Sequence, residues 1–172
     1  MTYEETLHYL YTSIPVFQHS GASAYKPGLG TSIALDDYLG NPHKAYKTIH
    51  VAGTNGKGSV SHLLAAILRQ SGFKVGLYTS PHLVDFRERI RVNGKKISQD
   101  YVVDFVERHR SFFEPLHPSF FELTSSMAFE YFRDQQVDYA VIEVGLGGRL
   151  DSTNIITCLL YTSPSPRDPK TS

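Results

Sequence analysis

Residues 47–59 of the chain read KTIHVAGTNGKGS, and this stretch decides the fold. Its first five residues are rich in apolar and β-branched side chains, which predicts a short buried strand. Glycines stop that strand at once, and apolar residues then recur at helical spacing from Val60 to Leu68. A strand, a glycine-rich turn that holds one lysine, and a helix follow one another in the order that a phosphate-binding loop requires.

Each residue type between Ala52 and Ser59 suits contact with a phosphate. The glycines let backbone N–H groups approach phosphate oxygens, and the helix N-terminus adds partial positive charge. Lys57 supplies a mobile full charge, and the Ser59 hydroxyl is suited to face Mg²⁺. The spacing departs from the usual Walker pattern because Gly58 separates the lysine from the hydroxyl. A turn that binds nothing is the alternative, but a lysine inside such a turn has little structural use. We therefore predict ATP binding by Asn55, Gly56, Lys57, Gly58 and Ser59.

Strands and helices continue to alternate on both sides of this loop. Thr2 and Glu5 form a capping-box pattern that predicts a first helix, and residues 15–44 predict a long connection with a short helix near residues 33–39. Asn93-Gly94 lies between two short apolar runs and predicts a hairpin. The remaining periodicity predicts strands at 74–78 and 138–144 and helices at 100–113 and 121–132. This order predicts an α/β fold with a doubly wound, mostly parallel sheet, whose ligands bind beyond the carboxyl ends of the strands.

Composition narrows the class of protein. The chain has 172 residues, and 17 lysines and arginines balance 17 aspartates and glutamates, so no basic field favours nucleic acid or a membrane surface. One cysteine, Cys158, excludes an intrachain disulfide. No apolar run approaches the roughly 20 residues that span a bilayer, and acids stand where a secretory signal would carry lysines. We expect a cytoplasmic protein, and a monomer, because no aromatic patch suggests an interface.

The loop sequence resembles that of folylpolyglutamate synthases and, more broadly, of Mur ligases, which typically carry threonine after the lysine. Further blocks follow in family order over residues 39–157. They are Leu39–His43, His50–Ala52, Thr79–Leu83, Arg87–Ser98, Phe120–Thr124 and Glu143–Asn154. The resemblance implies a truncated domain of the type at the centre of Mur ligases.

The resemblance also implies an activity. Such ligases use ATP to activate a carboxylate as an acyl phosphate, which an amine then attacks. Here the acid would be dihydropteroate or a folate, and the amine would be glutamate, as in folate biosynthesis and one-carbon metabolism. Charge neutralisation and positioning during phosphoryl transfer would carry the catalysis.

Roles follow for the residues that match the family's blocks. Lys57 would act in catalysis together with Glu143, and Ser80 matches the position of a Mg²⁺ ligand. Glu143 ends an apolar strand beside a glycine turn, where an acid is awkward unless it meets a cation, and Mg²⁺ prefers such oxygen ligands. The alternatives are a salt bridge for Glu143, a turn role for Ser80 and a core position for Phe121. By family match, the substrate contacts would be Phe121, Glu122, Thr124, Leu150, Asp151 and Ser152.

The resemblance ends before the family's second domain. We interpret residues 1–157 as part of an ATP-binding domain, and residues 158–172 as an unstructured tail that reads as a translated transposase sequencing adapter. Because a further metal ligand and the amine-binding domain have no counterpart here, we expect weak ATP binding and no ligation by these 172 residues.

Other functions stay open on the sequence alone. A Mur-type peptidoglycan ligase would usually read Lys-Thr-Thr where this chain has Lys57-Gly58-Ser59. A kinase with a phosphate-binding loop would carry Ser or Thr directly after the lysine and an arginine-rich lid. A non-catalytic nucleotide-binding module is a serious alternative for the chain by itself. The sequence does not separate dihydrofolate synthase from polyglutamate synthase, or define polyglutamate length or the preferred folate.

Overall fold

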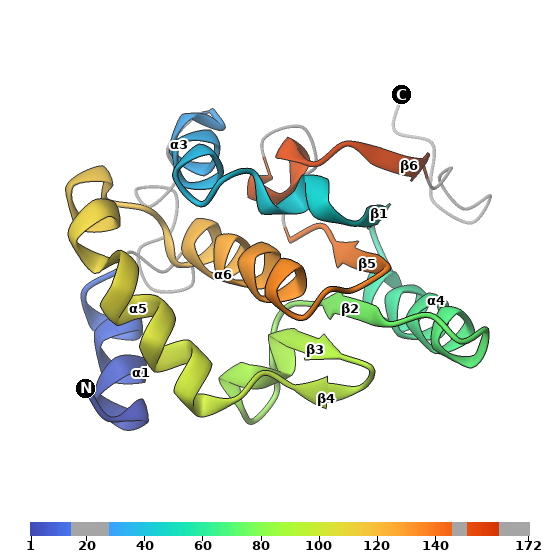
Figure 1. Cartoon of the computed structure of the whole chain (residues 1–172), viewed down its shortest axis with the longest axis horizontal. Coiled ribbons are helices and arrows are strands. Elements are labelled where there is room, and N and C mark those ends of the chain that lie inside the picture. The colour runs from blue at the N-terminus through green and yellow to red at the C-terminus, as the bar shows by residue number, and fades with distance from the viewer. Residues whose placement is uncertain (15–27, 146–150, 162–172) are drawn as a thin grey trace.

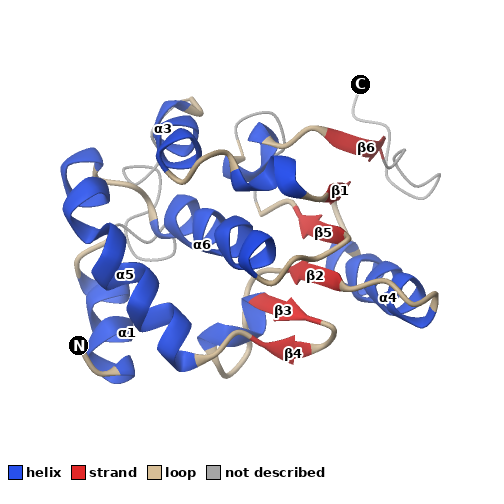
Figure 2. Ribbon diagram, viewed as in Figure 1, coloured by secondary structure: helices blue, strands red, loops and turns tan. Residues whose placement is uncertain are grey.

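The computed structural model describes residues 1–14, 28–145 and 151–161, with side chains described only up to residue 157. A six-stranded sheet in the order β4-β3-β2-β5-β1-β6 forms its centre (Figures 1 and 2). β2, β5, β1 and β6 are parallel, whereas β3 and β4 form an antiparallel hairpin on one edge. The strands are β1 (Lys47–Val51), β2 (Val75–Tyr78), β3 (Ile90–Val92), β4 (Lys95–Lys96), β5 (Tyr139–Glu143) and β6 (Cys158–Tyr161). The predicted α/β fold with a mostly parallel sheet is confirmed.

Helices cover both faces of the sheet (Figure 1). α4 lies on one face, and α6 lies on the other face, with α1, α3 and α5 packed outside it. The α-helices are α1 (Tyr3–Thr12), α3 (Gly30–Tyr38), α4 (Lys57–Gln70), α5 (Gln99–Phe113) and α6 (Phe120–Asp134). Short 3₁₀ turns connect them at η2 (Pro42–Ala45), η3 (Phe86–Arg89), η4 (Glu114–Leu116) and η5 (Ser152–Ile155). None of the helices in the described part of the chain is long and apolar enough to cross a membrane.

Alternation along β5 divides the core between the two faces. Ala140 and Ile142 point into the larger core under α6, while Val141 faces the smaller core under α4. Side chains of β5 therefore pack against α6 on one face of the sheet and against α4 on the other. These contacts hold the carboxyl end of β5 in place.

The outward side of α4 is unusually apolar. Leu64 and Leu68 pack on the sheet as the helical periodicity predicts, but Leu63 and Ile67 are 63% and 61% exposed. Val60, one turn before Leu63, is 42% exposed. Leu63 and Ile67 follow the helical period of the apolar residues but do not pack on the sheet, because the described residues give α4 neighbours only on its sheet side.

A glycine lets α6 approach the sheet closely. A Cβ atom added to Gly76 in β2 would lie 2.7 Å from Cδ1 of the Phe132 ring, which is fully buried in α6. Separations this short do not occur without a shift of neighbouring atoms, and both groups belong to packed elements.

Replacing Gly76 by alanine should therefore destabilise the fold by about 1–3 kcal/mol through overpacking. Gly30→Ala is the matched control, since a Cβ there would meet nothing within 4 Å, and we expect a change within about 1 kcal/mol. Urea unfolding followed by circular dichroism measures both. Equal stability of Gly76→Ala and wild type would contradict the close contact between β2 and α6.

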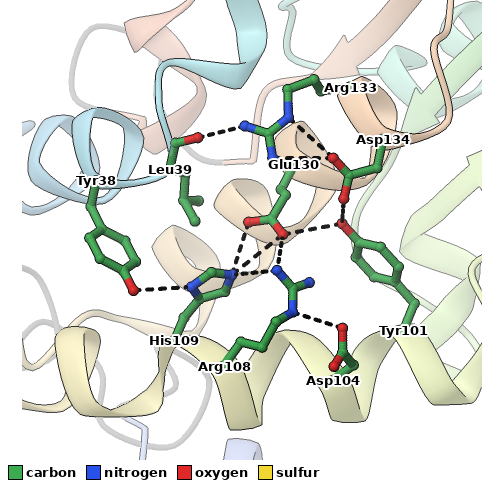
Figure 3. A network of polar contacts seen from close by, with 9 residues as sticks. All are labelled: Tyr38, Leu39, Tyr101, Asp104, Arg108, His109, Glu130, Arg133 and Asp134. Atoms are coloured by element: carbon green, nitrogen blue, oxygen red, sulfur yellow. Dashed lines mark hydrogen bonds and ion pairs between the residues drawn. The ribbon is translucent and has the colours of Figure 1, made fainter.

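A buried carboxylate joins α5 to α6 (Figure 3). Glu130 is 1% exposed and meets Arg108 Nη1 at 2.9 Å and His109 Nε2 at 3.0 Å. Burial alone would raise the pKa of Glu130, but hydrogen bonds and charges from His109 and Arg108 outweigh it and lower the pKa below the ordinary value. Tyr101 adds a hydrogen bond from its hydroxyl to Glu130.

We expect Glu130→Gln to lower the free energy of unfolding at pH 7 by about 1–3 kcal/mol, because Arg108 is partly exposed. A lowered pKa in the folded state stabilises the fold above the ordinary glutamate pKa and loses that effect as pH falls through the folded value. The difference from wild type should thus shrink as pH falls from about 5 through the lowered folded-state pKa of Glu130. Asp104→Asn, which removes an exposed partner of the same Arg108, should cost under about 1 kcal/mol. A pH-independent difference for Glu130→Gln would argue against the ionic contact.

The end of the described chain differs from our expectation. We expected an unstructured segment from residue 158, but Cys158–Tyr161 form β6, parallel to β1. η5 brings the chain to the free edge of β1, where extended backbone pairs with N–H and C=O groups that would otherwise lack partners. The Thr48 hydroxyl also donates to the Thr157 carbonyl at 2.7 Å. Residues 162–172 lie outside the described residues, and the adapter origin of the tail stays a prediction.

Candidate active site

The phosphate-binding loop lies between β1 and α4, as predicted. β1 ends at Val51 and α4 begins at Lys57, with Gly56 as its N-cap at φ 74°, a left-handed conformation that favours glycine. No side chain caps this helix, and Val60 N–H makes the first bond to the Gly56 carbonyl. The preceding N–H groups of the first turn are therefore left for an external acceptor. Ala52–Gly56 are exposed, so a phosphate has access to them.

Glu143 lies against this loop. It ends β5, is 4% exposed, and accepts a hydrogen bond of 2.9 Å from the Ser80 backbone N–H. A Cβ on Gly58 would lie 3.6 Å from its Oε1 atom, so the carboxylate touches the first turn of α4. Within the described residues, no lysine, arginine or histidine forms an ion pair with Glu143.

A buried carboxylate without a cation is costly, and a metal ion would relieve that cost. The Glu143 oxygens and the nearby Ser80 hydroxyl are the hard donors that Mg²⁺ prefers. The donor set therefore fits the metal, and the structure brings the two predicted metal ligands together. The salt bridge that was the alternative for Glu143 does not form in the described part of the chain.

Three of the predicted substrate residues gather beyond the end of β5. Phe121 lies over Gly145, where an added Cβ would be 2.7 Å from Cε2 of the ring. The Thr124 hydroxyl meets that of Tyr78 at 3.1 Å, and Ser152 meets Ser125 at 3.0 Å. These contacts place α6, β2 and η5 around one location at the carboxyl edge of the sheet. Leu150, a further predicted contact, lies outside the described residues.

Asp151 and Glu122 have structural contacts in addition to their predicted substrate role. Asp151 accepts from Gly145 N–H at 2.9 Å and Thr153 N–H at 3.0 Å, and also from the Thr153 hydroxyl, so it joins the two ends of residues 146–150. Glu122 accepts from the N–H and hydroxyl of Ser119, both at 2.8 Å, and completes the capping box of α6. The Ser119-x-x-Glu122 pattern is a sequence signal for that cap. Our prediction of the helix used only the apolar periodicity and did not use this signal.

His50 belongs to the same location, and sequence reasoning gave it no role. Its Nε2 atom lies 2.8 Å from the Thr153 hydroxyl, which itself donates to Asp151. Burial lowers the pKa of His50 and outweighs the opposing charge of Asp151. A neutral imidazole that donates to Thr153 follows, and β1 is thereby joined to η5.

An α/β domain of the Mur ligase fold is the class to which this sheet and loop belong. No family model matches the chain. The folylpolyglutamate synthase of Lacticaseibacillus casei is 40% identical over 164 residues, which cover 91% of this chain and 37% of that protein. The dihydrofolate synthase/folylpolyglutamate synthase of Bacillus subtilis is 42% identical over 142 residues, covering 78% and 33%.

Solved structures agree with the curated relatives. The crystal structure of a folylpolyglutamate synthase from Thermotoga maritima superposes with a TM-score of 0.81 at 48% identity, covering 91% of this chain and 36% of that one. The chain belongs to the folylpolyglutamate synthase/dihydrofolate synthase family, and it spans about a third of the length of these relatives.

Proposed function

We propose that the chain is the nucleotide-binding part of a ligase that uses ATP to join glutamate to dihydropteroate or a folate. The observation that carries the proposal is the buried Glu143 beside the first turn of α4, which forms no ion pair with a described cationic side chain. Related structures include an FPGS–AMPPCP–folate complex and E. coli FolC with DHPP and ADP, at 39% and 35% identity to this chain.

In phosphoryl transfer, the loop residues and the acid–hydroxyl pair have different roles. Lys57 and the amides of residues 55–59 hold the phosphates and neutralise charge while a carboxylate oxygen of the acid attacks the γ-phosphorus and ADP leaves. Glu143 and Ser80 would hold Mg²⁺, which when bound would supply further neutralisation of the phosphate oxygens. The glutamate amine then attacks the acyl carbon, and phosphate leaves with the electrons of the broken C–O bond.

The 172 residues alone should not complete this reaction. The exposed Leu63 and Ile67 on α4 match a surface that the remaining two-thirds of a full-length relative would cover. We infer that the chain by itself binds nucleotide weakly, as a module, and that ligation needs the rest of the protein. A monomeric state and a cytoplasmic location stay predictions.

Phosphate release by the protein encoded when the gene is read past codon 157 tests the proposal. Release should require ATP and either dihydropteroate or folate, and glutamate should accelerate it. Dependence on a UDP-muramyl peptide instead would assign the protein to the peptidoglycan ligases. Release without any acid would point to a different reaction, and turnover by the 172-residue chain would contradict its inferred inactivity.

A further inference from the structure

A buried arginine beside this site has no acidic partner among the described residues. Arg89 ends η3 and is 7% exposed, and its carbonyl accepts from the Thr79 N–H at 3.0 Å. Thr79 is followed by Ser80, whose N–H binds Glu143. Arg89 and Glu143 therefore flank the carboxyl end of β2 from its two sides.

The contacts of Arg89 leave most of its hydrogen-bonding capacity unused. Its Nε donates to His82 Nδ1 at 2.8 Å, and the guanidinium stacks 5.2 Å from the centre of the Phe120 ring. Because Nδ1 accepts, His82 carries its proton on Nε2, which lies 3.3 Å from the Tyr11 hydroxyl. With Nδ1 accepting and the proton on Nε2, this partner is a neutral imidazole.

The acidic residues closest to Arg89 in the sequence bind other partners. Asp85 binds Arg87 at 2.7 Å and Lys96 at 2.8 Å. Glu88 accepts from the backbone N–H groups of Leu83, Val84 and Asp85. Neither makes an ion pair with Arg89, and no other described acid does.

The two terminal nitrogens of Arg89 stay reachable. Among the described residues, the only fully buried side-chain nitrogen or oxygen atoms without a hydrogen bond are Ser61 Oγ and Glu130 Oε2. Arg89 Nη1 and Nη2 make no hydrogen bond and are absent from that set, so they keep contact with solvent. Burial raises the pKa of the nearby Tyr78 hydroxyl, whereas the Arg89 charge opposes that increase.

We propose that Arg89 is an anion-binding residue that receives a carboxylate of the acid substrate. A guanidinium offers two parallel N–H groups that match a carboxylate, and His82 and Phe120 fix its plane in advance. The ligand is a pterin-linked benzoate or its glutamyl derivative, so the inference rests on the proposed function and deepens it. Arg89 lies across the carboxyl end of β2 from Glu143, so a carboxylate bound to it lies at the same edge of the sheet as the nucleotide loop.

Binding of three probes to the 172-residue chain tests this proposal by NMR chemical-shift titration, which detects millimolar affinities. The probes are pteroate, 6-(anilinomethyl)pterin, which lacks only the carboxylate, and AMPPCP. Arg89→Met should weaken pteroate binding roughly 10- to 100-fold and leave the other two affinities unchanged. Arg89→Lys keeps the positive charge but removes the two parallel N–H donors of the guanidinium, so it should lose part of the affinity for pteroate. Arg91→Met is the matched control on the neighbouring strand, where Nε donates to the Glu88 carbonyl.

The outcomes separate this proposal from the proposed function. Equal losses for pteroate and its carboxylate-free analogue in a folded Arg89→Lys or Arg89→Met chain would overturn it, as would unchanged pteroate affinity. Wild-type chain that binds AMPPCP but not pteroate would overturn the Arg89 assignment and leave the nucleotide site standing. Carboxylate-dependent pteroate binding without AMPPCP binding would support Arg89 and contradict the proposed ligase.

Discussion

Replacement of Lys57 by methionine should weaken AMPPCP binding to the chain roughly 10- to 100-fold, since hydrogen bonds to charged groups contribute about 1.5–3 kcal/mol. Lys57 begins α4 next to an uncapped first turn, so its ammonium adds to the partial charge of the backbone amides at one place. Methionine preserves the length and helix propensity of the side chain and removes the charge.

The same NMR titration measures the effect of Lys57→Met. Lys95→Met is the control, because Lys95 is an exposed lysine in the β3–β4 hairpin, away from the loop. Similar affinities for Lys57→Met and wild type would mean that the loop binds no phosphate. An equal loss in both variants would indicate a general effect of net charge.

Replacement of Glu143 by glutamine should abolish the effect of Mg²⁺ on nucleotide binding. In the longer protein, it should reduce acid-dependent phosphate release by a factor on the order of 100 to 1,000, the scale of several kcal/mol in the transition state. Glutamine keeps the shape and can still accept from the Ser80 N–H, so the loss isolates the negative charge.

The melting temperature of Glu143→Gln distinguishes a metal-binding role of Glu143 from a structural role. If Glu143 were held in an ion pair, Glu143→Gln would destabilise the fold, but a buried carboxylate without a cation costs free energy in the absence of metal. We therefore expect an equal or higher melting temperature for Glu143→Gln without Mg²⁺. Glu4→Gln, at an exposed position of α1, is the control. A lower melting temperature together with retained Mg²⁺ dependence would contradict the metal assignment.

Local signals in the sequence were sufficient for most of the fold. The Asn93-Gly94 turn, the Thr2–Glu5 capping box and the strand before the loop depend on neighbouring residues, and all three form. The near-continuous apolar run in β5 is typical of a strand buried on both faces, and the two cores cover both of its faces.

Long-range packing accounts for what the sequence could not show. Leu63 and Ile67 follow the helical period, but their exposure depends on which neighbours are present. β6 forms because β1 offers a free edge, a property of the assembled sheet. Phe121, Thr124 and Ser152 were predicted from the resemblance. The contacts of His50 with Thr153 and of Arg89 with Phe120 join segments far apart in the chain.

A crystal structure of the 172-residue chain with AMPPCP and Mg²⁺ tests the central claim most directly. Our account predicts the terminal phosphates against the amides of residues 55–59 and beside Lys57, with the metal about 2.1 Å from a Glu143 oxygen. Nucleotide bound away from this loop, or phosphates at the loop while Glu143 contacts only the Ser80 N–H, would contradict it.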